Sequence, residues 1–292
     1  MTDIILLDGG MGQELVHRAG DRPTPLWSTQ VMIDHPGLVA KVHADYAAAG
    51  ATVHTTNTYA ILHDRLDGTG MEDQFAALYT AALKEAEGAG VLAGAIGPLG
   101  ASYRPDLMPA HDVAVATYTE VANLLAPKVD LIICETVASV AHARAILEAT
   151  VATAKPVWLA LTVDDADGTK LRSGEPLADV FAVAGAADAI LANCSSPEAI
   201  SAAIDVLATG DKPFGGYANG FTQISEGFLG DKPTVDALTA RHDLGPDEYA
   251  AFAMQWVAQG ATIVGGCCEV GPAHIAKLAD SITAAGHRIV AP

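Results

Sequence analysis

The stretch EYAAFAMQWVAQGATIVGGC, residues 248–267, contains a helical pattern followed at once by a strand pattern. Residues 248–260 are rich in Ala and end on Gly260, a residue typical of a helix C-terminus. The apolar run that follows, residues 261–267, has the length and composition of a buried strand. A helix and a strand joined without a linker predict the repeating unit of an α/β protein.

The same alternation recurs along the chain. Residues 36–50 have a helical pattern in which Leu38, Val42 and Tyr46 share one apolar face. Each strand-like run after the first follows such a helical segment, and no change in composition marks a second domain. The pattern predicts a single closed (β/α)8 TIM barrel that occupies residues 1–292 as one domain. The eight strand-like runs are residues 4–8, 52–57, 91–97, 131–136, 157–163, 189–194, 214–219 and 261–267.

The charge of the chain restricts its partners. It has 16 basic and 35 acidic residues, which gives a formal net charge of −19. Nucleic acid and anionic membranes are bound by clustered Lys and Arg, so neither is expected as a partner. A cationic small substrate would be compatible with this charge, although an acidic surface also serves solubility alone.

The apolar runs and the cysteines predict a cellular location. No apolar run approaches the roughly 18 residues that span a bilayer, and the chain begins with a strand-like run, residues 4–7, in place of a basic leader. Four cysteines are too few for a disulfide scaffold. We therefore expect a cytoplasmic protein with free thiols.

Polar residues collect at the ends of the predicted strands. The active site of a (β/α)8 barrel lies at the carboxyl ends of its strands, so these residues should meet at one mouth. Two loops rich in Gly and Pro, residues 97–109 and 219–233, are long enough to be lids or binding loops there. The polar strand ends are Asp8-Gly9-Gly10, Thr55-Thr56-Asn57, Glu135-Thr136, Thr162, Asn193-Cys194, Asn219 and Gly265-Gly266-Cys267-Cys268.

Three of the four cysteines stand at these strand ends. Cys194 ends the sixth run, Cys267 and Cys268 end the eighth, and Gly265-Gly266 allows the turn that both side chains of the pair would need. Three thiolate ligands with a fourth position left open are typical of a catalytic zinc site. Taken singly, Cys194 could be a small buried apolar residue, and the adjacent pair could be a redox disulfide.

Two carboxylates and a glycine pair complete the predicted mouth. Asp8 and Glu135 suit an ammonium group, although either could be a structural carboxylate. Gly9 and Gly10 can offer backbone N–H groups to a carboxylate at the start of the next helix. Cys134 points to the opposite side from Glu135, so we interpret it as structural. Sites for an ammonium, a carboxylate and a thiophilic metal together describe an amino acid that carries a thiol.

The glycine-rich segments and the histidines indicate no other cofactor. Residues 8–12 lack the spacing of a dinucleotide fingerprint, and no P-loop pattern occurs. His54, His111 and His274 have no metal-ligating partners at a useful spacing. We interpret these three histidines as structural or surface residues.

An ordered set of motifs, from about residue 4 to about residue 280, resembles the homocysteine S-methyltransferase family. A single motif of this kind would be a weak signal, but the set in this order is highly specific. The motifs are Leu7-Asp8-Gly9-Gly10-Met11-Gly12-Gln13-Glu14-Leu15, Leu26-Trp27-Ser28, Thr56-Asn57-Thr58-Tyr59, Gly97-Pro98-Leu99-Gly100, Cys134-Glu135-Thr136, Asn193-Cys194-Ser195, Gly265-Gly266-Cys267-Cys268 and Gly271-Pro272-Ala273-His274-Ile275.

The resemblance implies a (β/α)8 barrel with Zn2+ bound by three cysteines, here Cys194, Cys267 and Cys268. It also implies that homocysteine binds this zinc as a thiolate and attacks a methyl group. Asp8 and Glu135 would hold the homocysteine amino group.

Further roles follow from the same resemblance. The backbone around Gly9 and Gly10 would bind the homocysteine carboxylate. Trp27 and Tyr59 match aromatic positions on the donor side in betaine-dependent relatives, or else are ordinary core residues. The polar strand-end residues Asn57, Asn193 and Asn219 complete the candidate substrate-binding set.

The methyl donor is the least defined part of the predicted reaction. Thr136 stands where betaine-dependent relatives carry a tyrosine, and residues 217–221 partly match a segment of relatives that use S-methylmethionine. The resemblance therefore favours S-methylmethionine or S-adenosylmethionine as donor and methionine as product. Betaine, a corrinoid-linked donor, another thiol or selenol acceptor, and a non-enzymatic zinc or redox module are the alternatives. The chain lacks the long C-terminal extension by which betaine-dependent relatives form tetramers, so a monomer or dimer is expected.

Overall fold

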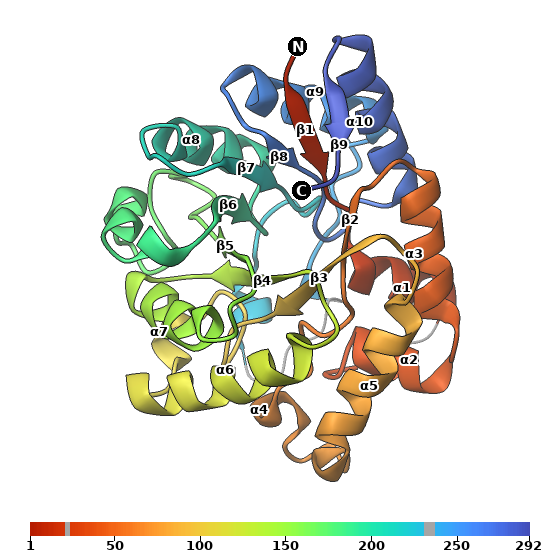
Figure 1. Ribbon diagram of the computed structural model, residues 1–292, viewed down its shortest axis with the longest axis vertical. Helices are drawn as coiled ribbons and strands as arrows, with labels where there is room; N and C mark the ends of the chain where they lie inside the picture. Colours follow the sequence, from red (N-terminus) through yellow and green to blue (C-terminus); the bar gives the residue numbers. More distant parts are fainter. Residues whose placement is uncertain (21–23, 231–236) are drawn as a thin grey trace.

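The centre of the structure, a computed structural model that describes residues 1–20, 24–230 and 237–292, is one ring of parallel strands. The strands are β1 (Asp3–Leu6), β2 (Val53–Thr55), β3 (Val91–Ile96), β4 (Leu131–Val137), β5 (Val157–Leu161), β6 (Ala189–Asn193), β7 (Phe214–Tyr217), β8 (Ile263–Val264) and β9 (Arg288–Val290). Their order in the sheet is β2-β3-β4-β5-β6-β7-β8-β1-β9. An isolated parallel bridge between Leu7 and Val53 joins β1 to β2 and closes the ring (Figure 1). The predicted (β/α)8 barrel is confirmed.

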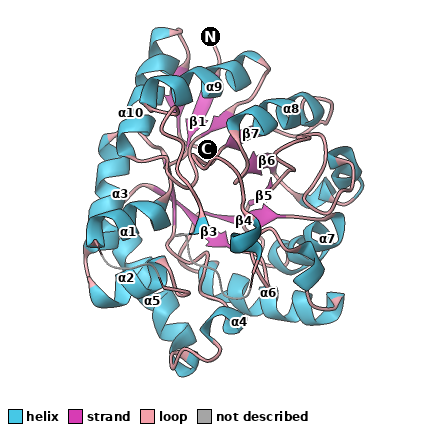
Figure 2. Ribbon diagram, turned by 180° about the vertical axis from the view of Figure 1, so that it is seen from behind, coloured by secondary structure: helices cyan, strands magenta, loops and turns pink. Residues whose placement is uncertain are grey.

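Helices cover the outside of the ring, as the two opposite views show (Figure 1, Figure 2). The α-helices are α1 (Met11–Ala19), α2 (Ser28–Asp34), α3 (Leu38–Ala48), α4 (His63–Leu66), α5 (Phe75–Ala86), α6 (His111–Leu125), α7 (Val140–Val151), α8 (Pro197–Leu207), α9 (Pro246–Ala258) and α10 (Pro272–Ala284). The helices expected over residues 36–50 and 248–260 correspond to α3 and α9. Between β5 and β6 the structure has the short 3-10 helices η3 (Leu177–Ala182) and η4 (Ala184–Ala186) where an α-helix would be regular.

The ninth strand, β9, lies outside the eight predicted runs and pairs beside β1, where the ring closes. β9 pairs in parallel with β1, with Asp3 opposite Arg288 and Ile5 opposite Val290. The Thr52 hydroxyl, just before β2, donates to the carbonyl of Val290 at 2.9 Å. β9 thus supplies partners at the place where β1 and β2 are joined by a single bridge.

β4 illustrates how each strand divides its side chains between two apolar layers. Leu131 and Ile133 pack inside the barrel, whereas Ile132 and Cys134 pack between the sheet and the helices. Burial raises the pKa of the Cys134 thiol to about 12. This placement agrees with the structural role predicted for Cys134. Glu135 follows on the inner side, at the carboxyl end of the strand.

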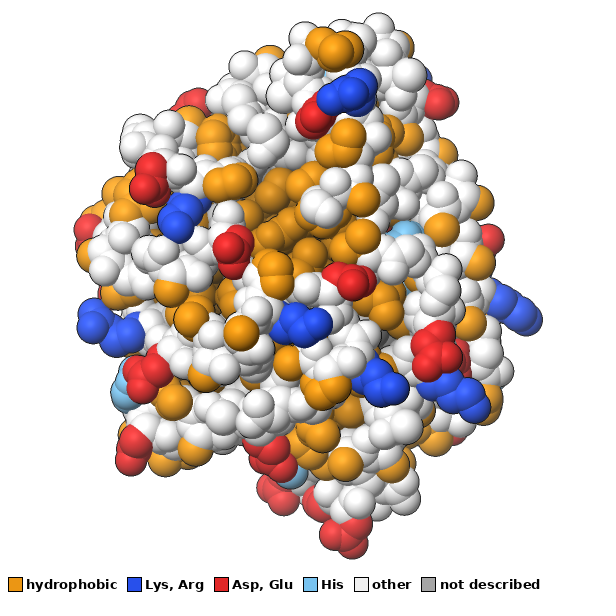
Figure 3. Space-filling view, in the orientation of Figure 1, with side chains coloured by type: hydrophobic (Ala, Val, Ile, Leu, Met, Phe, Trp, Pro, Cys, Tyr) orange, Lys and Arg blue, Asp and Glu red, His pale blue; other side chains and the backbone are white. Residues whose placement is uncertain are grey.

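The two ends of the ring differ in character. On the face drawn in Figure 3, apolar side chains gather around the centre of the ring, and Ile5 and Val91 pack against the apolar cluster inside it. At the other end, the short helix η5 (Glu226–Leu229), cyan in Figure 1, crosses the centre behind the strands. It belongs to the predicted lid loop 219–233, of which residues 231–233 lie outside the described residues. None of the helices in the described part of the chain combines the length and the apolar composition that a membrane span requires.

Candidate active site

A pocket at the carboxyl ends of the strands brings together most of the predicted site residues. Strand ends on opposite sides of the ring contribute to it, as expected for a barrel mouth. The predicted residues that line it are Asp8, Gly9, Gly10, Trp27, Asn57, Tyr59, Glu135, Cys194, Cys267 and Cys268.

The three thiols form the centre of this pocket. The Sγ atoms of Cys194 and Cys267 lie 2.6 Å apart, and all four cysteines of the chain are free thiols. Hydrogen bonds from the thiols of Cys267 and Cys268 hold the pKa of Cys194 well below its usual range. Their bonds to Cys194, first among the causes, raise the pKa values of Cys267 and Cys268. Cys194 is therefore the thiol that carries negative charge most readily, as a ligand of a soft metal ion must.

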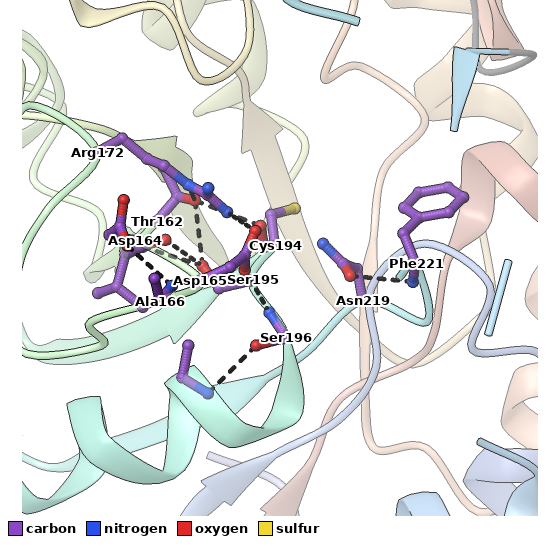
Figure 4. Close-up of polar contacts among 12 residues, drawn as sticks. Thr162, Asp164, Asp165, Ala166, Arg172, Cys194, Ser195, Ser196, Asn219 and Phe221 are labelled. Carbon is purple, nitrogen blue, oxygen red and sulfur yellow. Dashed lines mark hydrogen bonds and ion pairs between the residues drawn. The ribbon is translucent and has the colours of Figure 1, made fainter. Parts of the chain in front are cut away.

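Cys194 is held in an unusual backbone conformation at the end of β6. Its φ angle is 49°, in the left-handed region that non-glycine residues seldom adopt. The Thr162 hydroxyl donates to the Cys194 carbonyl at 3.3 Å, and Arg172 Nε donates to the same hydroxyl at 3.4 Å. Asp165 forms an ion pair with Arg172 at 2.8 Å. In Figure 4 the sulfur of Cys194 points away from this polar group, which thus supports the backbone and leaves the thiol to the pocket.

Two buried carboxyl groups face the same pocket. Asp8 accepts hydrogen bonds from the backbone amide and hydroxyl of Thr55 at 2.8 and 3.0 Å, and Tyr217 Oη donates to Glu135 Oε1 at 2.9 Å. Burial raises the pKa of Asp8 to about 7. Burial, reinforced by the charge of Cys194, raises the pKa of Glu135 to about 8. Carboxyl groups held this way favour a cationic partner, because an ammonium group would restore their ionised form.

The turn between β1 and α1 packs directly against the loop of the cysteine pair. A Cβ atom on Gly9 would lie 2.0 Å from the Val270 carbonyl oxygen, so only glycine fits there. The Gly10 amide donates to the same carbonyl at 2.9 Å, so it is used within the fold and is not a free donor. The Gly9 backbone and the first turn of α1 still line the pocket, where the positive end of the helix dipole favours an anion.

Aromatic side chains form another wall. Trp27 and Tyr59 meet edge to face with ring centroids 6.2 Å apart, and Tyr103 and Phe228 meet at 5.9 Å. All four side chains line the pocket. Tyr103, with a φ angle of 65°, belongs to the loop after β3 and could not be singled out from the sequence pattern. Aromatic faces of this kind attract onium cations.

The three asparagines have different positions. Asn57 lines the pocket, and its side-chain amide donates to the Ser28 carbonyl at 3.3 Å. Asn193 is fully buried and accepts from the Thr136 amide at 3.1 Å, while its own amide donates to Cys194 Sγ. Asn219 accepts from the Phe221 amide at 3.1 Å, a contact drawn in Figure 4. Asn193 and Asn219 are therefore engaged in holding strand ends.

A second group of possible metal ligands includes Asp8 and two histidines. One ligand atom each of Asp8, His43 and His54 lies within 4.8 Å of the other two, and all three side chains are buried. The Nδ1 atoms of both histidines have no hydrogen-bond partner among the described residues. Burial, then the neighbouring His54, lowers the pKa of His43 to about 3. His54 is buried, as a structural residue would be, but Asp8 and His43 beside it make it a possible metal ligand. The sequence spacing revealed no such partner for His54, because His43 comes from α3.

The other two histidines agree with their interpretation as structural or surface residues. His111 is exposed and pairs with Glu148 at 3.0 Å. His274 Nδ1 accepts from the amide of Gly271 at 3.2 Å at the start of α10.

The fold is that of a (β/α)8-barrel protein, and this pocket at the carboxyl ends of the strands is its candidate active site. A family model described as "Homocysteine S-methyltransferase" matches residues 5–282. The chain belongs to the homocysteine S-methyltransferase family and is an enzyme of that family.

Individual relatives agree with this assignment. The homocysteine S-methyltransferase of Escherichia coli (strain K12) is 31% identical over 94% of each chain. The selenocysteine Se-methyltransferase of Brassica oleracea var. italica is 22% identical, covering 92% of this chain and 86% of its own. A crystal structure of the homocysteine methyltransferase MmuM from Escherichia coli in a metallated form superposes with a TM-score of 0.79 at 28% identity, covering 95% of this chain and 96% of the other.

Proposed function

We propose that this enzyme transfers a methyl group from a sulfonium donor, S-methylmethionine or S-adenosylmethionine, to the thiolate of L-homocysteine, giving methionine. We further propose that it does so with Zn2+ held by Cys194, Cys267 and Cys268. The observation that carries the proposal is that three thiols and the two buried carboxyl groups of Asp8 and Glu135 line one pocket.

The three cysteine side chains are suitable ligands for zinc. Three thiols with a pKa shift that favours thiolate at Cys194 are the soft, anionic ligands that zinc takes, with a fourth position left for a substrate. When bound, zinc would lower the pKa of a homocysteine thiol, so that a thiolate is available at neutral pH. The metallated form of the Escherichia coli relative supports a metal in this family.

The side chains of the pocket bind and orient the acceptor. Glu135, oriented by the Tyr217 hydroxyl, and Asp8 accept hydrogen bonds from the homocysteine ammonium group. The first turn of α1 attracts its carboxylate. The acceptor sulfur is thereby directed towards the three cysteines.

The transfer itself needs no proton donor once the acceptor is a thiolate. Its sulfur forms the new bond to the methyl carbon while the bond between that carbon and the donor sulfonium breaks, and the electron pair leaves with the donor sulfide. Trp27, Tyr59 and Tyr103 stabilise the onium group of the donor through their faces and exclude water. The pocket contributes mainly by holding the two sulfur atoms in line.

A selenol acceptor is the second candidate, because selenocysteine methyltransferases are among the relatives. Selenocysteine carries the same ammonium and carboxylate groups, so the pocket chemistry would serve it as well. A comparison of homocysteine and selenocysteine as acceptors, with betaine tested beside the two sulfonium donors, separates these activities.

Metal analysis of purified variants tests the metal assignment. The wild-type protein should hold about one zinc ion per chain and should form methionine. Cys268→Ala should lose both properties. Cys134→Ala, which alters a buried thiol outside the pocket, is the matched control and should keep both.

A third variant, His43→Ala, locates the ion. If the metal remains in Cys268→Ala and is lost in His43→Ala, the ion belongs to the group of Asp8, His43 and His54 instead. Methionine formation by metal-free protein at the full rate would contradict a role for zinc in the reaction.

A further inference from the structure

Arg65 brings a positive charge into a pocket otherwise lined by acidic and neutral groups. It lies in the short helix α4, which the loop after β2 leads into (Figure 1). Among the described residues that line the pocket, it is the one cationic side chain. The methyl transfer proposed above gives this charge no role.

The guanidinium group is poorly satisfied by the protein. Nη2 donates to the Pro98 carbonyl at 3.3 Å and to the Ser102 hydroxyl at 3.5 Å, both uncharged acceptors at long distances. Nε is buried and has no hydrogen-bond partner within the described part of the chain. No described carboxylate forms an ion pair with Arg65. A buried donor of a charged group left without a partner is costly, so this arrangement indicates an anionic ligand.

The neighbours of Arg65 belong to the aromatic wall. Ser102 Oγ, which Arg65 contacts, lies 2.8 Å from Tyr59 Oη, and Tyr59 in turn meets Trp27 edge to face. Burial, then the charge of Cys194, raises the pKa of Tyr59, and the positive charge of Arg65 opposes this shift. Arg65 thus lines the same pocket as the thiols and is linked to the aromatic wall through Ser102 and Tyr59.

We propose that Arg65 binds the carboxylate of the methyl donor, so that the donor is an onium compound that carries a carboxylate, such as an amino-acid sulfonium. This inference rests on the proposed function. Asp8, Glu135 and the first turn of α1 are used by the ammonium and carboxylate groups of the acceptor in the proposed function, so Arg65 is left for the carboxylate of the second substrate. A donor bound this way directs its onium methyl group past Trp27 and Tyr59 towards the acceptor sulfur. The planar guanidinium is suited to a carboxylate through two parallel hydrogen bonds.

Steady-state kinetics of zinc-loaded protein test the inference with two donors. One is the sulfonium donor that the wild-type enzyme uses, and the other is its carboxamide, which keeps the onium group but has no negative charge. The wild type should prefer the carboxylate donor in kcat/KM by about 10- to 100-fold, the range for a charge-assisted hydrogen bond. Arg65→Gln should lose this preference, because its kcat/KM should fall for the carboxylate donor and stay unchanged for the carboxamide. Its KM for homocysteine should not change.

Two further variants complete the design. Arg65→Lys, which keeps the charge but not the planar fork, should retain part of the preference. Arg288→Gln changes an exposed arginine paired with Asp3 on β9, outside the pocket, and should behave as the wild type. If Arg65→Gln does not fold, as judged by circular dichroism, the preferences of the wild type and of Arg65→Lys still decide the question.

Three outcomes would overturn the inference. The first is an equal loss of kcat/KM for both donors in Arg65→Gln. The second is a raised KM for homocysteine in that variant with kcat/KM for the donors unchanged. The third is a wild-type enzyme with the same kcat/KM for the carboxylate and the carboxamide donor. Failure of the proposed function looks different, because the wild type would then form no methionine from homocysteine with any onium donor.

Discussion

At the scale of single residues, Glu135 is the clearest test of acceptor binding. Replacement by Gln keeps the shape and the contact with Tyr217 but removes the charge that an ammonium group needs. Because a hydrogen bond to a charged group contributes about 1.5–3 kcal/mol, kcat/KM for homocysteine should fall about 10- to 100-fold in Glu135→Gln. Initial rates at varied homocysteine and saturating donor measure this. The exposed Glu148→Gln is the control, and an unchanged kcat/KM for homocysteine in Glu135→Gln would remove Glu135 from the site.

The sequence could predict the residue types of the mouth but not their conformations. Asp8, Glu135 and Cys194 are found from the sequence because each follows directly on an apolar strand, and strand ends in a barrel share one mouth. The positive φ angle of Cys194 depends on contacts from a different loop, which leave no local pattern. Arg65 lies in a helix of four residues without a motif, and its place at the pocket is decided by the packing of the loop around it.

At the scale of elements, α6 and α7 meet through a buried neutral histidine. His142 Nδ1 accepts from the Ala138 amide at 3.4 Å, and its other nitrogen lies 2.8 Å from the Tyr118 hydroxyl. Burial lowers the pKa of His142 from 6.5 to about 4. As the pH falls, the unfolded chain therefore takes up a proton first, and this contribution to stability, full above pH 6.5, is lost towards pH 4.

The size of this effect can be predicted. Between pH 7 and pH 5, His142 should account for a decrease of about 2 kcal/mol in the free energy of unfolding. Urea unfolding at the two pH values measures it, and His142→Gln should show a smaller difference by that amount. His63→Gln, at an exposed histidine, should keep the wild-type difference. A difference in His142→Gln as large as in the wild type would show that His142 does not remain neutral in the fold.

Tyr249 of α9 connects the ends of β7 and β8. Its hydroxyl donates to the Gly265 carbonyl at 2.6 Å and accepts from the Ala218 amide at 3.1 Å, and the Ala218 carbonyl accepts from the Cys267 amide at 2.9 Å. Tyr249→Phe should therefore lower the free energy of unfolding by about 1–3 kcal/mol, because buried backbone groups lose their partner. It should also weaken zinc retention in a competition with a chelator.

Tyr79→Phe is the matched control for this prediction. Its hydroxyl also donates to a buried carbonyl, that of Ile61 at 2.8 Å, which belongs to the loop after β2 and not to the strand ends that carry the cysteines. The control should lose about 1 kcal/mol of stability and keep its zinc affinity. Equal zinc retention by both variants would mean that α9 does not hold the cysteine loop in place.

The elements that the sequence did not predict share a physical cause. β9 has three residues and acquires its strand conformation by pairing with β1, so no periodicity of its own identifies it. The short helices η3 and η4 replace a regular helix after β5. The loop before them carries Arg172, which contacts Cys194 through the Thr162 hydroxyl. In both places long-range contacts override local propensity.

At the scale of the whole molecule, the repeat of strand and helix was sufficient to predict the architecture. Eight repeats that each lack a partner for their apolar faces can bury them together by closing into a barrel. The position of the mouth could be predicted from the same repeat, because all strands are parallel and their polar carboxyl ends must lie on one side of the barrel. Identity of the methyl donor does not follow from the repeat, since the loops that bind it vary independently of the barrel.

The net charge of −19 leads to a prediction for the whole molecule. Self-repulsion among acidic groups destabilises the compact state. Salt weakens this repulsion, because the Debye length falls from about 30 Å at 0.01 M to about 3 Å at 1 M. The melting temperature at pH 8 should therefore rise by about 2 °C or more between 10 mM and 500 mM NaCl, which corresponds to roughly 1 kcal/mol at this chain length. This rise in melting temperature should be smaller at pH 5.5, because the net charge is smaller closer to the isoelectric point of 4.6. Thermal unfolding followed by circular dichroism at both pH values measures it. A rise of the same size at pH 5.5 would assign the effect to general salt stabilisation instead of to charge repulsion.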